Sequence, residues 1–226
     1  YESEFRTMCT NRGTGWYQYR YVDHALLQLL SYIEYGTFNT QAALGLGIVN
    51  KASGTYNEAE DTDSNHSTWS YSLETPSWGD TSAGLSAVIY RGIENPYGNI
   101  WKWADNVQLY GDGYYLGIGV EPSDARTDYQ FIAIPPLGYD GYVYNYFSDI
   151  VHDSEIDYAF FPSKFGGGDS TYFTDYHWSY NPGAYRALLA GGSWHDGRRA
   201  GFGCLYGISS PSHRNRYFGG RVIFCG

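Results

Sequence analysis

Tyrosine and glycine restrict the fold of this chain more than any other feature of its sequence. The 226 residues include 25 Tyr and 29 Gly. Tyrosine favours strands and glycine favours tight turns, so short strands and irregular loops are expected rather than a helical bundle. Seven Trp and an apolar fraction of 42% are enough for a core, and the length fits one large domain. We expect a single α+β domain over residues 1–226.

Helices are expected only near the N-terminus, within residues 1–48. Residues 1–21 look like a polar lead-in with a turn at 13–16. A longer helix is predicted next. Asp23 lies in its expected first turn, where an acid is favoured, and Gly36 is expected to end it. A second, short helix is predicted at 40–44, before two further glycines. Apolar residues at three- and four-residue spacing predict the longer helix: Val22, Leu26, Leu29, Leu30 and Ile33.

Beyond residue 48 the pattern changes to short strands separated by turns. Trp101 and Trp103 alternate about Lys102, as strand residues do. Residues 57–65 form an acidic run whose carboxylates lack the spacing and the glycine of a calcium loop, so a solvated loop is expected there. The other candidate strands are 87–91, 114–120, 129–134, 141–147, 187–190 and 221–224.

The last part of the chain, residues 180–226, differs from the rest in charge and in residue types. It contains six Arg and a single acid, Asp196, whereas the whole chain has a net charge of −10. It also contains no Lys, Glu, Gln, Met or Thr. Arg and Tyr are enriched at the energetically important positions of interfaces, whereas Lys is depleted. We therefore expect loops of this segment, carried by a rigid frame, to form a binding face.

Charge and hydropathy exclude several other roles. A net charge of −10 disfavours a nucleic-acid partner, which needs a basic face. No apolar run approaches the length of a membrane-spanning helix. The first three residues do not resemble a signal peptide, and without an initiator Met the chain is expected to be a fragment or a processed product.

The three cysteines are scattered and suggest no metal site. Cys9, Cys204 and Cys225 form neither a metal-ligand spacing nor a disulfide framework. A Cys204–Cys225 bridge and buried free thiols both fit the sequence. No cofactor or metal site is predicted, although a structural cation is compatible with the composition.

Four stretches of the chain resemble one protein family. They read RGTGW at 12–16, IEYGTFNTQ at 33–41, YRGIENPYGNIW at 90–101, and GGSW at 191–194 together with GGRV at 219–222. Together they resemble bacteriophage tail and tropism proteins that have a C-type-lectin fold of the formylglycine-generating-enzyme type. Within this family, the four stretches most resemble the variable proteins of diversity-generating retroelements. The resemblance covers most of the chain, more loosely in residues 50–85 and 105–170.

The resemblance implies a C-type-lectin-like fold, with N-terminal helices, a twisted antiparallel sheet and long loops. It also implies that residues 180–226 carry variable, ligand-facing positions on a fixed frame. The frame residues would be Gly191, Gly192, Ser193, Trp194, Gly219, Gly220 and Arg221.

In such proteins the variable residues arise by mutation at adenines, largely in AAY codons, which never become Lys, Glu, Gln, Met or Trp. Those five types are absent from the candidate variable positions. The arginines among these positions would meet carboxylates, phosphates or sulfates, and the tyrosines would supply flat apolar area. The candidates are His195, Asp196, Arg198, Arg199, Leu205, Tyr206, Ile208, His213, Arg214, Asn215, Arg216 and Tyr217.

The function implied by the resemblance is receptor binding by a phage-tail or prophage-encoded tropism determinant. Its partner would be a host cell-surface protein or glycan, and its location a virion tail or a cell surface. The phage relatives suggest a homotrimer. The alternative is a lectin-like structural tail protein with a fixed carbohydrate specificity.

Catalysis is not expected. The formylglycine-generating oxidase of the same fold needs two cysteines shortly after Gly-Gly-Ser. The aligned positions here are Asp196 and Gly201, and Cys204 is alone. The six histidines show no ligand spacing, and no serine stands in a nucleophile-elbow pattern.

Two non-catalytic alternatives fit the residues less well. A calcium-dependent sugar site would need Glu-Pro-Asn and Trp-Asn-Asp triplets. The chain instead has Glu-Asn-Pro at 94–96, Trp-Ala-Asp at 103–105 and Glu-Pro-Ser at 121–123. An inert structural tail component would need an apolar, fixed interface, which the arginine-rich segment does not provide.

Overall fold

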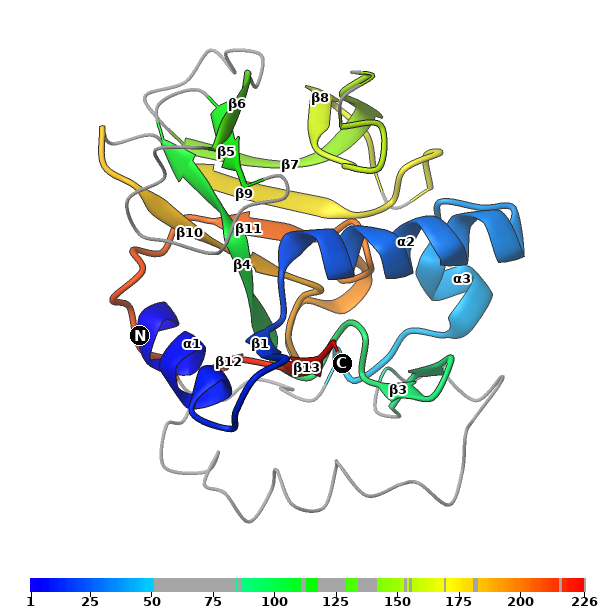
Figure 1. Cartoon of the computed structure of the whole chain (residues 1–226). Coiled ribbons are helices and arrows are strands. Elements are labelled where there is room, and N and C mark those ends of the chain that lie inside the picture. Colours follow the sequence, from blue (N-terminus) through cyan, green and yellow to red (C-terminus); the bar gives the residue numbers. More distant parts are fainter. Residues whose placement is uncertain are drawn as a thin grey trace.

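The protein has a mixed α+β fold in which strands predominate, which confirms the expected class (Figure 1). The computed structural model describes residues 1–50, 84, 87–110, 113–117, 129–133, 142–152, 154, 156–168, 170–180, 183–215 and 217–225. The acidic run at 57–65 lies outside the described residues. Helices α1 (Glu2–Thr10), α2 (Tyr21–Tyr35) and α3 (Thr40–Leu44) are all N-terminal.

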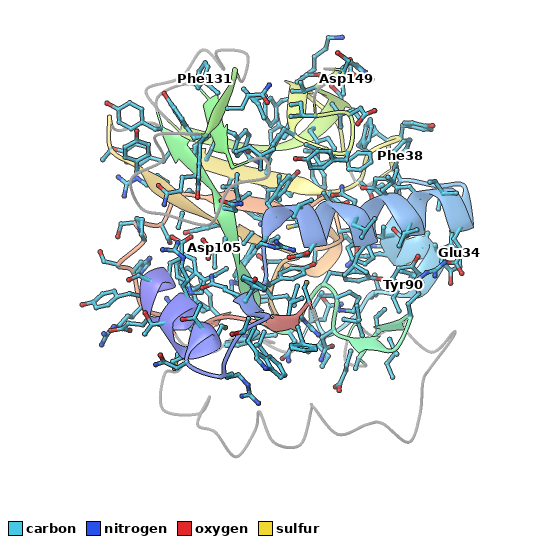
Figure 2. All side chains as sticks on the ribbon, in the orientation of Figure 1. Glu34, Phe38, Tyr90, Asp105, Phe131 and Asp149 are labelled. Carbon is cyan, nitrogen blue, oxygen red and sulfur yellow. The ribbon has the colours of Figure 1, made fainter. Side chains whose placement is uncertain are left out.

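Helix α1 corrects the prediction of a polar lead-in at the start of the chain. It has no apolar stripe that periodicity could detect, since Glu2 and Cys9 are its buried residues. A tertiary ion pair holds it instead. The Arg6 guanidinium donates to both carboxylate oxygens of Asp105 at 2.7 Å, and Asp105 is only 1% exposed. Figure 2 shows Asp105 on β4, beside α1.

Helix α2 is confirmed, together with its end at Gly36, which has a left-handed φ of 64°. Its buried face, however, is not the aliphatic stripe, because Leu26 and Ile33 are 54% and 71% exposed. The buried face includes His24 and Gln28, whose polar groups are bonded internally. A hydrogen-bonded polar side chain can be buried without a large penalty. The short helix α3 is also confirmed and begins at the side-chain cap of Asn39.

The strands form one large curled sheet and two small pairs. Among the described residues the sheet has nine strands in the order β6-β5-β4-β10-β11-β9-β7-β8, with β12 against β4. A hairpin of β2 (Ile89–Tyr90) and β3 (Ile93–Glu94) is tied to α2, since Tyr90 donates to Glu34 at 2.9 Å (Figure 2). Strand β1 (Trp16–Gln18) pairs with β13 (Val222–Phe224). The sheet strands are β4 (Trp101–Tyr110), β5 (Gly113–Leu116), β6 (Gln130–Ala133), β7 (Tyr142–Ile150), β8 (Pro162–Phe165), β9 (Tyr176–Tyr180), β10 (Arg186–Ala190), β11 (Leu205–Gly207) and β12 (Phe218–Gly219).

The sheet is mostly antiparallel, but two of its pairings are parallel, whereas the expectation was an antiparallel sheet. Strand β11 is antiparallel to β10 and parallel to β9, and β12 is parallel to β4. After β10 the chain makes the loop 191–204 and returns to insert β11 between β10 and β9. The C-terminal segment therefore supplies strands to the middle of the sheet, and its loops are held at both ends.

The two faces of the sheet bury different sets of residues. One face carries a mainly aliphatic cluster that includes Leu188, Ala190 and Leu205, with Tyr21 and Ala25 of α2 packed on it. The other face carries an aromatic cluster that includes Trp101, Trp103, Trp178 and Phe218. Alternation along the strands explains most of this division, because successive side chains point to opposite faces. In β4 a register shift against β10 reverses the alternation, so Trp103 lies on the aromatic face but Val107 in the aliphatic cluster.

Candidate functional site

The register of the central strands places Tyr206 on the aromatic face of the sheet. Tyr206 lies opposite Leu189 of β10 and opposite Trp178 of β9. Its neighbour Leu205 lies opposite Ala190 and is 1% exposed in the aliphatic cluster. Leu205 therefore packs in the core and does not face a ligand, although it was among the candidate variable positions. Consecutive residues of a regular strand point to opposite faces.

A continuous band of rings crosses this aromatic face. Ring centroids are 4.3 Å apart for Tyr176–Trp178, 6.1 Å for Trp178–Tyr206 and 6.1 Å for Tyr206–Phe218. The band continues through Tyr217, which lies 4.9 Å from Phe218 and 5.3 Å from His195. Trp178 and Phe218 are buried, whereas Tyr176, Tyr206, Tyr217 and His195 are partly exposed. The accessible rings thus rest on a rigid aromatic floor.

Two arginines of the short 3-10 helix η2 (Gly197–Arg199) lie at one end of this band. Arg199 is exposed, and its guanidinium lies 5.2 Å from the Tyr176 ring. Arg198 is also exposed and lines a small hollow of about 70 Å³ together with Gln41 and Thr174. A guanidinium over a tyrosine ring combines a cation–π contact with free donors for an anionic group.

The predicted positions after β11 lie toward α1. The Arg214 guanidinium lies 4.0 Å from the Tyr1 ring and donates to the Glu4 carboxylate at 2.8 Å. The N-terminal ammonium and Arg214 lower the pKa of Glu4. His213 is exposed, and its Nδ1 lies 2.8 Å from the Ser209 hydroxyl.

Three further candidates complete the predicted set. Ile208 is half-buried against the aromatic cluster. Asn215 is half-buried in the turn before β12, where its carbonyl accepts from the Phe218 N–H at 3.1 Å. Arg216 lies outside the described residues.

Asp196 holds its own loop together. One carboxylate oxygen, Oδ2, accepts from the Ser193 N–H at 2.6 Å and from the Ser193 hydroxyl at 2.7 Å. Burial raises the pKa of Asp196. The His195 Nδ1 lies 3.1 Å from the same hydroxyl. Because the carboxylate and the imidazole both contact Ser193, and the imidazole does not lie between the other two groups, they do not form a nucleophilic relay.

The predicted frame residues have the geometry of a scaffold. Gly191 and Gly192 have φ values of 93° and 81°, a region that residues with a Cβ rarely adopt. Ser193 and Trp194 are buried. A Cβ on Gly219 would lie 2.4 Å from Ile100, and one on Gly220 would lie 2.6 Å from Phe5. Arg221 donates to the backbone carbonyls of residues 94 and 95.

Sequence reasoning missed two aromatic residues and one acid of this region. Tyr176 and Trp178 precede the segment 180–226 but belong to the same band of rings, and the alternation of aromatics at 176, 178 and 180 was the available signal. Asp175 is fully buried beneath the loop 201–203, where its Oδ2 accepts from the Gly203 N–H at 2.8 Å. Burial raises the pKa of Asp175 to about 8.

We call the accessible residues of this region the tyrosine–arginine face. They lie on or beside the band of rings, except Arg214, which follows His213 in the chain and lies over the Tyr1 ring: Tyr176, His195, Arg198, Arg199, Tyr206, His213, Arg214 and Tyr217. Four half-buried rings and three exposed guanidinium groups can together hold a flat or apolar group and an anionic one.

The cysteines give this region no paired-thiol chemistry. All three are free thiols, and Cys204 is buried beneath the face. Burial raises the pKa of the Cys204 thiol well above its ordinary value, which disfavours the reactive thiolate. Among the residues that the structure describes, no three His, Cys, Asp or Glu side chains come together as a metal site.

Comparison of the sequence with protein-family models and with curated proteins found no match. None of the described helices is both long and apolar enough to cross a membrane. The interpretation of the tyrosine–arginine face therefore depends on its geometry and on the resemblance of the motifs in the sequence.

Proposed function

We propose that this protein is a receptor-binding display protein of a phage tail or prophage, with a C-type-lectin-like fold and the tyrosine–arginine face as its ligand-binding surface. The observation that carries the proposal is the continuous band of rings from Tyr176 to His195, with Arg199 over one end. N-terminal helices against a curled, mostly antiparallel sheet support the fold assignment.

The proposed mechanism is non-covalent recognition of a host-surface protein or glycan. Tyrosine rings provide contact area at a low cost in side-chain entropy. Arginine provides bidentate donors for carboxylate, phosphate or sulfate groups. Several copies displayed on one particle, such as a trimer, would raise a weak single-site affinity by increasing the effective concentration.

The first test of this function is charge reversal at Arg199. We expect R199E to weaken adhesion of the fluorescently labelled protein to intact bacterial cells by at least about tenfold, since a charge-assisted contact would become a repulsion. Adhesion would be measured by flow cytometry across a panel of strains. Arg12 gives a matched control, because it is also an exposed arginine over an aromatic ring, 4.8 Å from Trp16.

The proposal requires R12E to adhere like the wild-type protein. Equal losses in R12E and R199E would indicate a non-specific effect of net charge, and unchanged adhesion of R199E would exclude the tyrosine–arginine face as the contact surface.

The second test concerns diversification and uses nucleotide sequence. We expect the locus to carry, beside a reverse transcriptase, a second and imperfect copy of the 3′ end that differs only at adenines of the template. Across isolates, changes should then fall at positions such as His195, Arg198 and His213 and spare Gly191 and Gly192. A single invariant copy would rule out diversification and favour a tail lectin of fixed specificity.

A further inference from the structure

A cleft of about 440 Å³ lies beside the frame of the binding segment but shares no residue with the tyrosine–arginine face. Its walls come from the turn between β3 and β4 and from the connection between β12 and β13. The volume falls in the range of small-molecule sites, about 300–1,000 Å³. The function proposed above does not use this cleft.

Two basic side chains line the cleft and occupy the carbonyl groups of the turn. Lys102 is 3% exposed, and its Nζ donates to the Gly98 and Ile100 carbonyls at 3.2 and 3.1 Å. Arg221 donates to the carbonyls of residues 94 and 95. The backbone acceptors at these four positions therefore already have donors. Burial lowers the pKa of Lys102 well below its ordinary value, and its two bonds use both N–H groups of a neutral amine. The bonds of Arg221 both come from Nη2, so its other guanidinium N–H groups can donate to a ligand.

Two side-chain amide oxygens of the same cleft are not satisfied. The Oδ1 atoms of Asn95 and Asn99 are shielded from water and have no hydrogen-bond partner, and Asn95 is only 7% exposed. Burial raises the pKa of the neighbouring Glu94. Both asparagines also have left-handed φ values, 47° and 66°. Unsatisfied polar groups and strained backbone together are typical of binding sites.

Charge decides what kind of donor could satisfy these oxygens. A cation in the cleft would be repelled by the Arg221 guanidinium, and Glu94 is the single carboxylate among the lining residues. An anion has only acceptor atoms, whereas the two amide oxygens need hydrogen-bond donors. A neutral polyol provides hydroxyl groups that both donate and accept. Ile100 and Val222 give the cleft apolar walls for its C–H groups.

We propose that this cleft binds a neutral saccharide unit. Its hydroxyl groups donate to the Asn95 and Asn99 amide oxygens and accept from the Arg221 guanidinium, without a bridging calcium ion. A second sugar-binding site next to the frame would let the protein hold a host glycan independently of the tyrosine–arginine face.

The test uses the ¹⁵N-labelled full chain and four neutral probes, the methyl glycosides of glucose, galactose, mannose and N-acetylglucosamine, each at millimolar concentration. We expect at least one probe to shift the amide resonances of residues 94, 95, 97–100 and 220, equally with and without a calcium chelator. The proposal is overturned if no probe shifts them, if the shifts need calcium, or if they map to the tyrosine–arginine face.

Two variants then examine the residues themselves. N95G and N99G remove the amide oxygens, while glycine retains the left-handed backbone at both positions. We expect each to weaken the binding of the responding probe by about tenfold. N11G removes an exposed asparagine at the end of α1 and should bind like the wild-type protein. Wild-type affinity in both N95G and N99G would overturn the assignment even if the cleft resonances shift.

Discussion

Replacing Gly192 by alanine is expected to lower the free energy of unfolding by about 2–5 kcal/mol. Gly192 has a φ of 81°, and an L-residue in this region costs about 1–2 kcal/mol. A Cβ would also lie 2.6 Å from the Ala200 Cβ and 3.0 Å from the Ala200 Cα. Overpacking against Ala200 adds about 1–3 kcal/mol. Urea denaturation followed by tryptophan fluorescence would measure the loss.

Gly36 provides the matched control for this prediction. It has a φ of 64° at the end of α2, but a Cβ added there would have no neighbouring atom within 4 Å. G36A should therefore lower the free energy of unfolding only by the conformational cost of an L-residue at positive φ, about 1–2 kcal/mol. If G192A loses no more than G36A, then the close packing of the loop 191–204 does not contribute to stability.

The same contact connects stability to the binding face. Ala200 directly follows η2, which carries Arg198 and Arg199. A movement of Ala200 that relieves the clash in G192A would displace these two arginines, including the Arg199 guanidinium from its position over Tyr176. A frame glycine can thus affect recognition without touching a ligand, which is the usual relation between a rigid scaffold and its loops.

Local signals predicted much of the fold. Helix α2 has three- and four-residue periodicity with a glycine stop, α3 has an asparagine cap, and both lie where they were expected. Strands β10 and β13 also coincide with the predicted apolar pieces. In each case the residues that specify the element lie within it or directly beside it in the sequence. The element could therefore be predicted without knowledge of distant contacts.

Tertiary contacts decided the features that were missed. Helix α1 is positioned by the Arg6–Asp105 pair, whose members are 99 residues apart. The aliphatic stripe of α2 is partly exposed because hydrogen bonds to Tyr19 and Phe202 allow His24 to occupy the buried side. Neither partner is visible in the local pattern of the helix.

The candidate site was predictable as a segment but not residue by residue. The composition of 180–226 identified the loops, yet the insertion of β11 beside β9 determined that Leu205 is buried and that Tyr176 joins the face. A one-residue register decides which side chains of a strand face a ligand.

Replacing Asp175 by asparagine is expected to remove a pH dependence of stability. The folded protein holds the Asp175 proton up to a pKa of about 8, far above its ordinary value of 3.8. Between these values the folded state binds one more proton than the unfolded state. Raising the pH therefore favours unfolding, by up to about 1.4 kcal/mol per pH unit for this group. The stabilising contribution is complete below pH 3.8 and is lost as the pH rises through 8.

The difference between D175N and the wild-type protein isolates this effect. Burial lowers the pKa of His24 to about 4 and that of His177 to about 3, so both destabilise the folded protein as the pH falls below 6.5. These contributions are present in both proteins and cancel in the difference. The buried neighbours Tyr32 and Tyr97 stay neutral in this range, because burial raises their pKa well above 10. Urea denaturation at increasing pH values between 4 and 8 should measure this difference. The free energy of unfolding of D175N should rise, relative to that of the wild-type protein, with each increase in pH.

Asp149 is the matched control, because its carboxylate is partly exposed and pairs with Lys164 at 2.8 Å. The hydrogen bond from Lys164 lowers the pKa of Asp149, so D149N should show a small difference of the opposite sign, confined to acidic pH. A constant difference between D175N and the wild-type protein from pH 4 to pH 8 would mean that Asp175 is ionised throughout. In that case the loop 201–203, which carries the Gly203 N–H, would have to open enough to hydrate the carboxylate, and the arginines before it would not be held on a closed frame.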